Sequence, residues 1–116
     1  MGIIENITKR KTIIADTKEI NTSFGKILGL MFRKAPLEYG VIFPFRESSP
    51  RELHTWFVRY PIDVLFINKH RYIVDMIRNL KPFSSYSCGL NHQYVIELPA
   101  GCIEGADCQI TDQVEF

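Results

Sequence analysis

The 116-residue sequence contains few cysteines and lacks the paired spacings that metal sites and disulfide frameworks use. Three cysteines, Cys88, Cys102 and Cys108, leave one unpaired in any intramolecular scheme, which is typical of a reducing compartment. No Cys-x-x-Cys or His-x-x-x-His pair offers two ligands from one turn, so no metal site is predicted. We therefore expect reduced thiols and a cytoplasmic protein.

Long apolar runs and an excess of one charge are also missing. Each apolar run is interrupted by Pro, Arg or Asp well before the roughly 18 residues that span a bilayer, and the amino terminus lacks the features of a secretory signal. Fourteen Lys and Arg nearly balance thirteen Asp and Glu, which gives a net charge of +1. We therefore expect no membrane partner and no nucleic-acid partner.

The common catalytic and cofactor motifs are missing as well. The sequence has no Gly-rich phosphate loop, no Gly-x-Ser-x-Gly elbow and no His-Glu-x-x-His helix. No cofactor is predicted. These absences leave open whether the chain is an enzyme.

The composition and periodicity of the chain predict a folded β protein. Hydrophobic residues make up 46% and charged residues 23%, in the range of globular proteins, and the length fits one domain over residues 1–116. Short strand-like runs alternate with turn-formers every ten or so residues. The pattern predicts a mainly β fold, an antiparallel jelly-roll-like sandwich or partly open barrel, with one short helix near residues 20–33.

The strands are expected where apolar and β-branched residues alternate. We predict strands over residues 3–7, 11–16, 41–45, 64–67, 72–77, 94–98 and 113–116. The polar residues 68–71 predict an antiparallel hairpin between two of these strands. The strand over residues 41–45 is expected near a sheet edge and to end in a polar turn at 46–51. Residues 81–92 are expected to form a long loop that could act as a lid.

One segment, residues 54–67, concentrates polar and aromatic side chains. Two strand-like runs meet there at Pro61, which cannot donate a ladder hydrogen bond, so we expect a corner. His54, Trp56, Arg59 and Asp63 lie within ten positions of it. Such a cluster could bind a ligand, or it could brace the junction of two sheets.

Two readings are open for the carboxylate of Asp63. It starts an otherwise apolar run, so a buried position would require hydrogen-bond donors or a cation. We favour a structural role in which Asp63 accepts backbone N–H groups at the corner. The alternative is general acid or base catalysis with His54 as its partner.

Arg33, Trp56 and Glu97 each have a structural and a functional interpretation. Arg33, near the end of the predicted helix, could anchor a ligand anion, but a structural pair with Asp63 or Glu97 is favoured. Glu97 alternates with apolar neighbours and is expected to face solvent, whereas a buried Glu97 would be the natural partner of Arg33. Trp56 fits a core wall better than a stacking platform. His70 and His92 are expected to be solvated loop residues.

Four ordered motifs resemble those of the domain-of-unknown-function 192 family. They lie at residues 29–33, 40–45, 54–67 and 95–101. The resemblance covers about residues 15–116 and implies a small β-sandwich of jelly-roll type, without naming a reaction. The sequence departs from the family where a Gly-Asp pair is replaced by Thr111-Asp112, and Thr suits a positive φ poorly.

Three hypotheses for function follow. The favoured one is a binding or accessory domain for a small molecule or peptide, with Arg33, Trp56, Arg59 and Glu97 as binding residues. The second is a metal-independent hydrolase or lyase with His54 and Asp63 as its catalytic acid-base pair and Arg33 as anion anchor. The third is assembly through the edge at residues 41–45, and we expect a monomer or weak homodimer.

Overall fold

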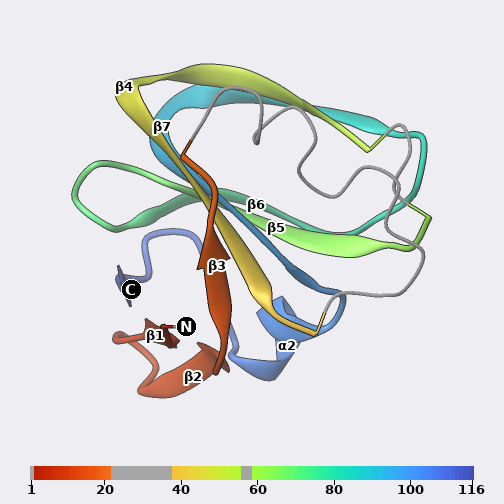
Figure 1. Ribbon diagram of the computed structural model, residues 1–116. Helices are drawn as coiled ribbons and strands as arrows, with labels where there is room; N and C mark the ends of the chain where they lie inside the picture. Colours follow the sequence, from red (N-terminus) through yellow and green to blue (C-terminus); the bar gives the residue numbers. More distant parts are fainter. Residues whose placement is uncertain (1, 22–37, 56–58) are drawn as a thin grey trace.

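The computed structural model describes residues 2–21, 38–55 and 59–116, which form two sheets (Figure 1). The larger sheet has the order β3-β4-β7-β5-β6 and the smaller the order β2-β1-β8. The strands of the larger sheet are β3 (Thr17–Glu19), β4 (Gly40–His54), β5 (Ile62–Ile67), β6 (Ile73–Leu80) and β7 (Ser85–Pro99). Those of the smaller sheet are β1 (Ile4–Asn6), β2 (Lys11–Ile14) and β8 (Val114–Glu115).

The predicted mainly β, sandwich-like fold is confirmed. All strand pairs are antiparallel except β3 with β4, which run parallel. In the described part of the chain neither sheet closes on itself. The predicted hairpin joins β5 to β6, with Leu65 opposite Met76.

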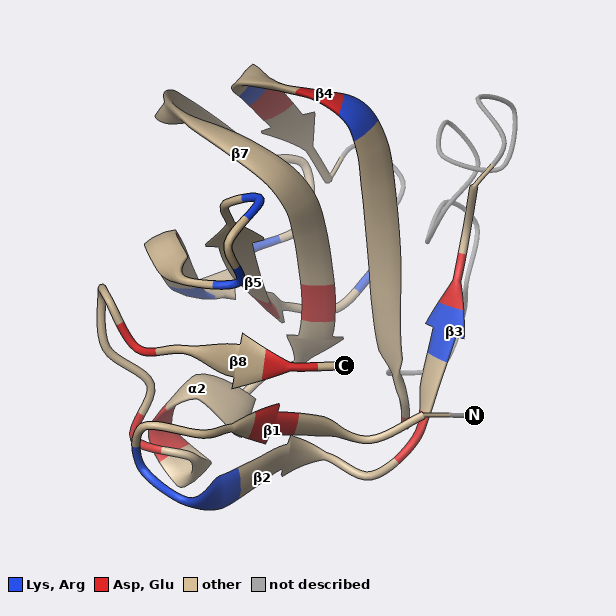
Figure 2. Cartoon of the chain, turned by 90° about the vertical axis from the view of Figure 1, so that its left-hand side faces the viewer, with Lys and Arg blue, Asp and Glu red and all other residues tan. Residues whose placement is uncertain are grey.

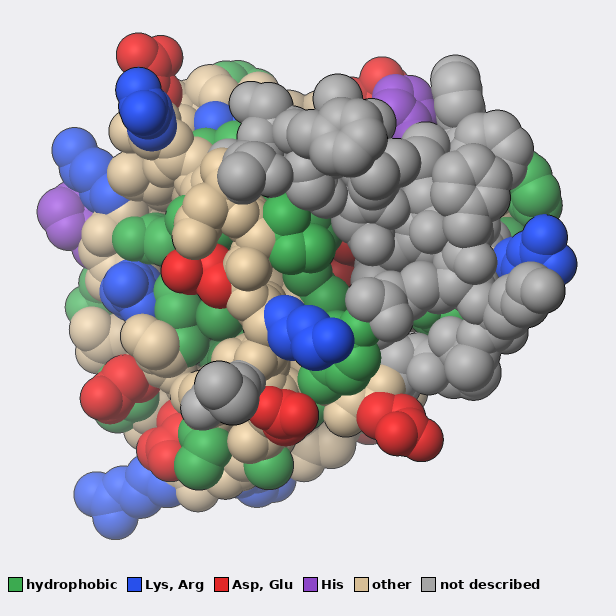
Figure 3. All heavy atoms as spheres, viewed as in Figure 1, with side chains coloured by type: hydrophobic (Ala, Val, Ile, Leu, Met, Phe, Trp, Pro, Cys, Tyr) green, Lys and Arg blue, Asp and Glu red, His purple; other side chains and the backbone are tan. Residues whose placement is uncertain are grey.

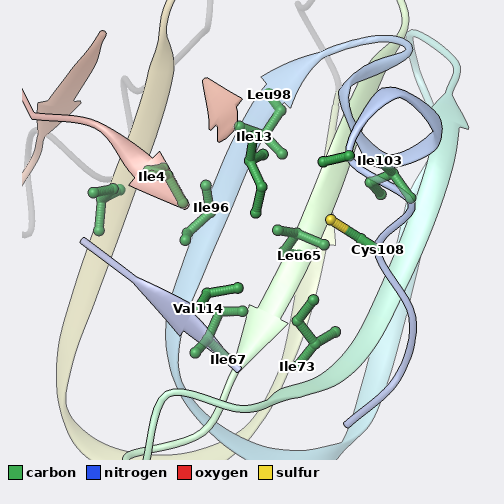
Figure 4. Packing of buried hydrophobic residues seen from close by; sticks show 12 residues of the cluster. Ile4, Ile13, Leu65, Ile67, Ile73, Ile96, Leu98, Ile103, Cys108 and Val114 are labelled. Atoms are coloured by element: carbon green, nitrogen blue, oxygen red, sulfur yellow. The ribbon is translucent and has the colours of Figure 1, made fainter. Parts of the chain in front are cut away.

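A hydrophobic core fills the space between the two sheets (Figure 4). One face of the five-stranded sheet contributes Leu65, Ile96 and Leu98, and the three-stranded sheet contributes Ile4 and Val114. The short helix α2 (Cys102–Gly105), which the sequence analysis missed, adds its one buried residue to the same cluster. The three-stranded sheet and α2 therefore cover the part of one face of the larger sheet that carries this core.

The opposite face of the five-stranded sheet, called here the second face, carries a second buried cluster. Its members are Val41, Phe43, Tyr60, Ile62, Val64, Phe66, Leu80, Cys88 and Val95. The long strands β4 and β7 bend (Figure 2), so Leu53 and Tyr86 from their far halves pack on this same cluster. Because both faces of the sheet are covered, all six residues of β5 are buried.

Strand β4 differs from the prediction in its length. It lies near an edge of the sheet, beside the short edge strand β3, but it continues through the segment predicted as a polar turn. Register shifts between Pro44 and Ser49 and between Ser49 and Arg51 accommodate the prolines, which sheets tolerate at bulges. Arg51 Nη atoms donate to backbone carbonyls of Glu47 and His92, which ties the irregular stretch together.

Residues 81–92 do not form the predicted loop, because most of them belong to β7. Their polar residues pair with the far half of β4, with Leu53 opposite Tyr86 and Arg51 opposite Cys88. The prediction that this segment forms a lid is therefore wrong. The predicted helix near residues 20–33 falls almost entirely outside the described residues.

Candidate functional site

Asp63 is held on β5 as the acceptor of three backbone N–H groups. Its Oδ1 accepts from Asn79 at 2.8 Å, and its Oδ2 accepts from Gly101 and Ile103 at 3.0 Å each. The residue is almost fully buried. These bonds fasten β5 to the end of β6 and to the start of α2, so the structural role favoured for Asp63 is the one that forms.

The structure does not bring His54 to Asp63. His54 ends β4, its side chain is 42% exposed, and its Nε2 lies 3.0 Å from Glu52 Oε1. In the sheet His54 pairs with Ser85 at the start of β7, whereas Asp63 pairs with Leu98 near its end. Each member of the hypothetical acid-base pair therefore has another partner.

Arg33 and Trp56 lie outside the described residues, so their predicted roles stay predictions. Arg59 is exposed and follows the end of β4 in the connection to β5. That connection joins β4 to β5, which belong to the same sheet and lie on either side of β7. It does not join two different sheets. A brace between two different sheets, one of the two interpretations of this corner, therefore does not form at Pro61.

Glu97 is buried, contrary to the expectation that it faces solvent. Only 5% of its surface is exposed. Alternation along β7 does turn it away from Ile96 and Leu98, but the face it turns to is the second face, which is itself covered. Its neighbours across the sheet are Val41 on β4 and Val64 on β5.

The Glu97 carboxyl makes no hydrogen bond or ion pair with any residue that the structure describes. The two valines beside it offer no donor. Desolvation by burial raises the pKa of Glu97 from 4.5 to about 8, because the charged form loses its hydration without gaining a partner. The carboxyl of the free protein is therefore mainly protonated at neutral pH.

Aromatic side chains belong to the same face. Phe43, Tyr60 and Phe66 are members of the buried cluster, and Tyr39 packs against it. The Nζ of Lys18 lies over the Tyr39 ring, 4.5 Å from its centroid. In the space-filling view hydrophobic side chains reach the surface beside charged ones (Figure 3). Among the described residues, the side chains that share this face with Glu97 are therefore mainly apolar and aromatic.

His92 is the second buried polar group of this face, and the expectation that it is a solvated loop residue is wrong. It lies on β7, fully buried, with its ring edge-on to Phe66 at 5.0 Å between centroids. Nδ1 lies 2.9 Å from the carbonyl oxygen of Leu90, so Nδ1 carries the proton and Nε2 is an acceptor. No hydrogen-bond partner of Nε2 lies within residues 2–21, 38–55 and 59–116. Burial lowers the pKa of His92.

Three further polar side chains lie near His92: Tyr86 and Asp75 bond each other, and Cys88 is a buried thiol. The Tyr86 hydroxyl donates to Asp75 Oδ2 at 2.7 Å, a bond that raises the pKa of Tyr86 to about 12. Burial raises the pKa of Cys88, which makes the thiol a poor nucleophile. No group of three His, Cys, Asp or Glu side chains in the described ranges is placed to hold a metal ion.

Comparison with known proteins supplies the family. The family model for DUF192, described as "Uncharacterized ACR", matches residues 4–116. The chain belongs to the DUF192 family. It is 32% identical over 111 residues to UPF0127 protein PF1050 of Pyrococcus furiosus, covering 96% of this chain and 95% of that protein.

Two crystal structures share the fold of this DUF192 protein. A protein of unknown function from Novosphingobium aromaticivorans DSM 12444 has a TM-score of 0.84 at 19% identity, covering 98% of this chain and 82% of that one. A Sinorhizobium meliloti 1021 protein, provisionally described as a transcription regulator, has a TM-score of 0.79 at 25% identity, covering 85% and 79%. Within the described ranges of this chain, no helix is long and apolar enough to span a bilayer.

Alternation along the sequence puts Glu97 on the correct face of the sheet, but the expectation that this face meets solvent was wrong, as was the expectation that His92 is exposed. The signal for Glu97 was present, since a lone carboxyl interrupts an apolar strand whose neighbour β5 is apolar at five of six positions. For His92 no signal was available, because the serine-rich residues before it resemble a loop.

Proposed function

We propose that this DUF192 protein is a non-enzymatic domain that binds a small molecule on its second face, around Glu97. The observation that carries the proposal is the buried carboxyl of Glu97, which has no partner among the described residues. A buried polar group without a partner costs roughly 1–3 kcal/mol, and more if it is charged. A ligand that offers a polar partner would recover that cost.

The surroundings of Glu97 support a binding role. Ligand sites in proteins are mostly apolar, with a few polar groups that fix orientation. Val41 and Val64 flank the carboxyl on central strands of the sheet, which hold it in a fixed place. Phe43 and Phe66 add aromatic surface.

The geometry gives less support to the hydrolase or lyase alternative. That mechanism needs a base within hydrogen-bond reach of its partner, and His54 and Asp63 each bond elsewhere. The cytoplasmic setting stays part of the proposal. It is consistent with free thiols at all three cysteines, Cys88, Cys102 and Cys108.

DNA binding is the competing class, because the Sinorhizobium relative is described as a regulator of transcription. A net charge of +1 gives this chain little of the positive field that attracts phosphate backbones. We expect no electrophoretic shift of a random DNA duplex at 150 mM salt. A salt-dependent shift at micromolar protein would favour the competing class.

Ligand-observed and protein-observed NMR with a fragment library test the binding proposal. We expect hits whose amide shift changes centre on Val41, Val64 and Glu97. Glu97→Gln should weaken these hits, whereas Glu115→Gln, on the exposed side of β8, should leave them unchanged. Shift changes confined to the three-stranded sheet, or hits that both variants retain equally, would contradict the proposed site.

A further inference from the structure

We propose that the ligand group bound beside Glu97 is an organic cation, a protonated amine or quaternary ammonium attached to an apolar body. This inference rests on the proposed binding function and specifies its chemistry. It follows from the position of one acidic group in a cross-strand row, from the aromatic side chains of that face, and from the place of the cation in the same row.

The row of residues across the sheet leaves the charge of Glu97 unbalanced. Lys18, Val41, Glu97, Val64 and Ile77 are consecutive register partners on β3, β4, β7, β5 and β6. Lys18 is two strands away, about 10 Å at ordinary strand spacing, and its amine lies over a tyrosine ring. An apolar residue stands on each side of the carboxyl, so within the row no cation adjoins it.

An anionic ligand group gains only one hydrogen bond, from the protonated carboxyl of Glu97, and it is repelled by the negative faces of the aromatic rings. A neutral polar group could share one hydrogen bond with the protonated acid. A cation gains more, since it pairs with the carboxylate and can also contact aromatic faces, which attract ammonium groups by about 0.5–2 kcal/mol each. Phe43, Tyr60 and Phe66 belong to this cluster. The chemistry of the face therefore favours an ammonium group.

The other titratable groups facing this cluster do not replace Glu97 in that role. Strand β3 contributes Lys18, and the segments beside the strands contribute Tyr39 and Tyr60. Asp75 and Tyr86 bond each other, farther along the sheet. His92 lies beyond Phe66 and is an acceptor at Nε2. Glu97 is thus the one acidic group in the described part of this row.

A measurable consequence is the release of a proton on binding. In the free protein Glu97 is mainly protonated at pH 7, because burial raises its pKa to about 8. Pairing with a cation stabilises the carboxylate and lowers that pKa. Binding of an ammonium ligand at pH 7 should therefore release close to one proton, whereas binding of a neutral analogue should release none.

The test is calorimetric titration of the full chain at pH 7 in phosphate and in Tris, which differ in ionisation enthalpy. The probes are two matched pairs, benzylamine with benzyl alcohol and tryptamine with tryptophol. We expect the amines to bind at least tenfold more tightly than the alcohols, with release of close to one proton. Glu97→Gln should abolish the release and weaken the amines at least tenfold, while Glu115→Gln should change neither.

The possible results separate the two proposals. Alcohols that bind as tightly as amines, with no proton released and with sensitivity to Glu97→Gln, would overturn the cation and leave the binding site standing. Amine binding that Glu97→Gln leaves unchanged would overturn the assignment to this carboxyl. If neither these probes nor any member of the fragment library binds, both the proposed function and this inference are wrong.

Discussion

Asp63 Oδ2 accepts a hydrogen bond from the backbone N–H of Ile103 at 3.0 Å, across 40 positions of sequence. Ile103 is the buried residue of α2, and Asp63 lies on β5, between β7 and the edge strand β6. The bond fixes the helix against the sheet while the Ile103 side chain fills the core between the two sheets. Asp63, one carboxylate of the predicted site, therefore has a structural role, whereas Glu97 has no partner among the described residues.

Asp63→Ala should strongly destabilise the fold. The substitution leaves the N–H groups of Asn79, Gly101 and Ile103 without their acceptor, and each buried unsatisfied group costs roughly 1–3 kcal/mol. We expect a loss of at least about 3 kcal/mol in unfolding free energy, measured by urea denaturation. Glu104→Ala, which removes an exposed carboxylate from α2 itself, should cost less than about 1 kcal/mol. Equal effects of the two substitutions would contradict the capping role.

The stability of the ligand-free protein should rise as the pH falls from 8 toward 5. The folded pKa of Glu97 is raised from 4.5 to about 8, so in that interval the folded state binds more protons than the unfolded state. The resulting stabilisation is complete below about pH 4.5 and is lost as the pH rises through 8. Its full size is about 4–5 kcal/mol.

Glu97→Gln supplies the control for that titration. The amide cannot ionise, so the variant should show a flatter profile and should be more stable than the wild type at pH 9. Urea denaturation at half-unit steps of pH measures both curves. Parallel curves for the two proteins would show that Glu97 does not titrate with a raised pKa.

His92 should oppose this trend at lower pH. Burial lowers its pKa from the ordinary 6.5, so the folded state holds the neutral ring and the unfolded state takes up the proton first. Stability from His92 is present above pH 6.5 and is lost as the pH falls through the folded pKa. His92→Gln should remove this dependence in urea denaturation, whereas His70→Gln, at an exposed position, should preserve it. If the His92→Gln variant keeps the same pH dependence of stability, another titrating group must cause it.

Thr111→Gly should stabilise the protein. Thr111 has a φ of +77°, a left-handed conformation that costs a residue with a Cβ about 1–2 kcal/mol. Glycine adopts it freely but loses more entropy on folding, so we expect a net gain of up to about 1 kcal/mol in thermal unfolding. Thr111→Ala keeps the Cβ and should bring no gain. A destabilised glycine variant would mean that the Thr side chain contributes more than the strain.

Local signals made part of the fold predictable. The hairpin at residues 68–71 was predicted from its polar composition, and Asn68 Oδ1 does accept the backbone N–H groups of His70 and Tyr72. The poor fit of threonine to the turn at Thr111-Asp112 was also predicted from local sequence, and the positive φ of Thr111 confirms it. Such features depend on a few neighbouring residues, which a single sequence contains.

The location of Glu97 could not be predicted, because it depends on distant strands. Alternation correctly put Glu97 opposite Ile96 and Leu98, but it assumed that the second side of the sheet meets water. The bend of β4 and β7 packs Leu53 and Tyr86, from the far halves of the two strands, against the buried cluster of that side. The bend in turn relies on the polar residues 81–92 joining a strand, which their composition does not indicate.

The most direct test of the account is a carbon-13 NMR titration of the Glu97 side-chain carboxyl, in the free protein and with saturating benzylamine. We expect a midpoint near 8 for the free protein and a midpoint at least two units lower with the amine bound. A midpoint near 4.5 in the free protein, unchanged by the amine, would contradict it, because a cation of the chain itself, such as Arg33, would then already balance the carboxylate.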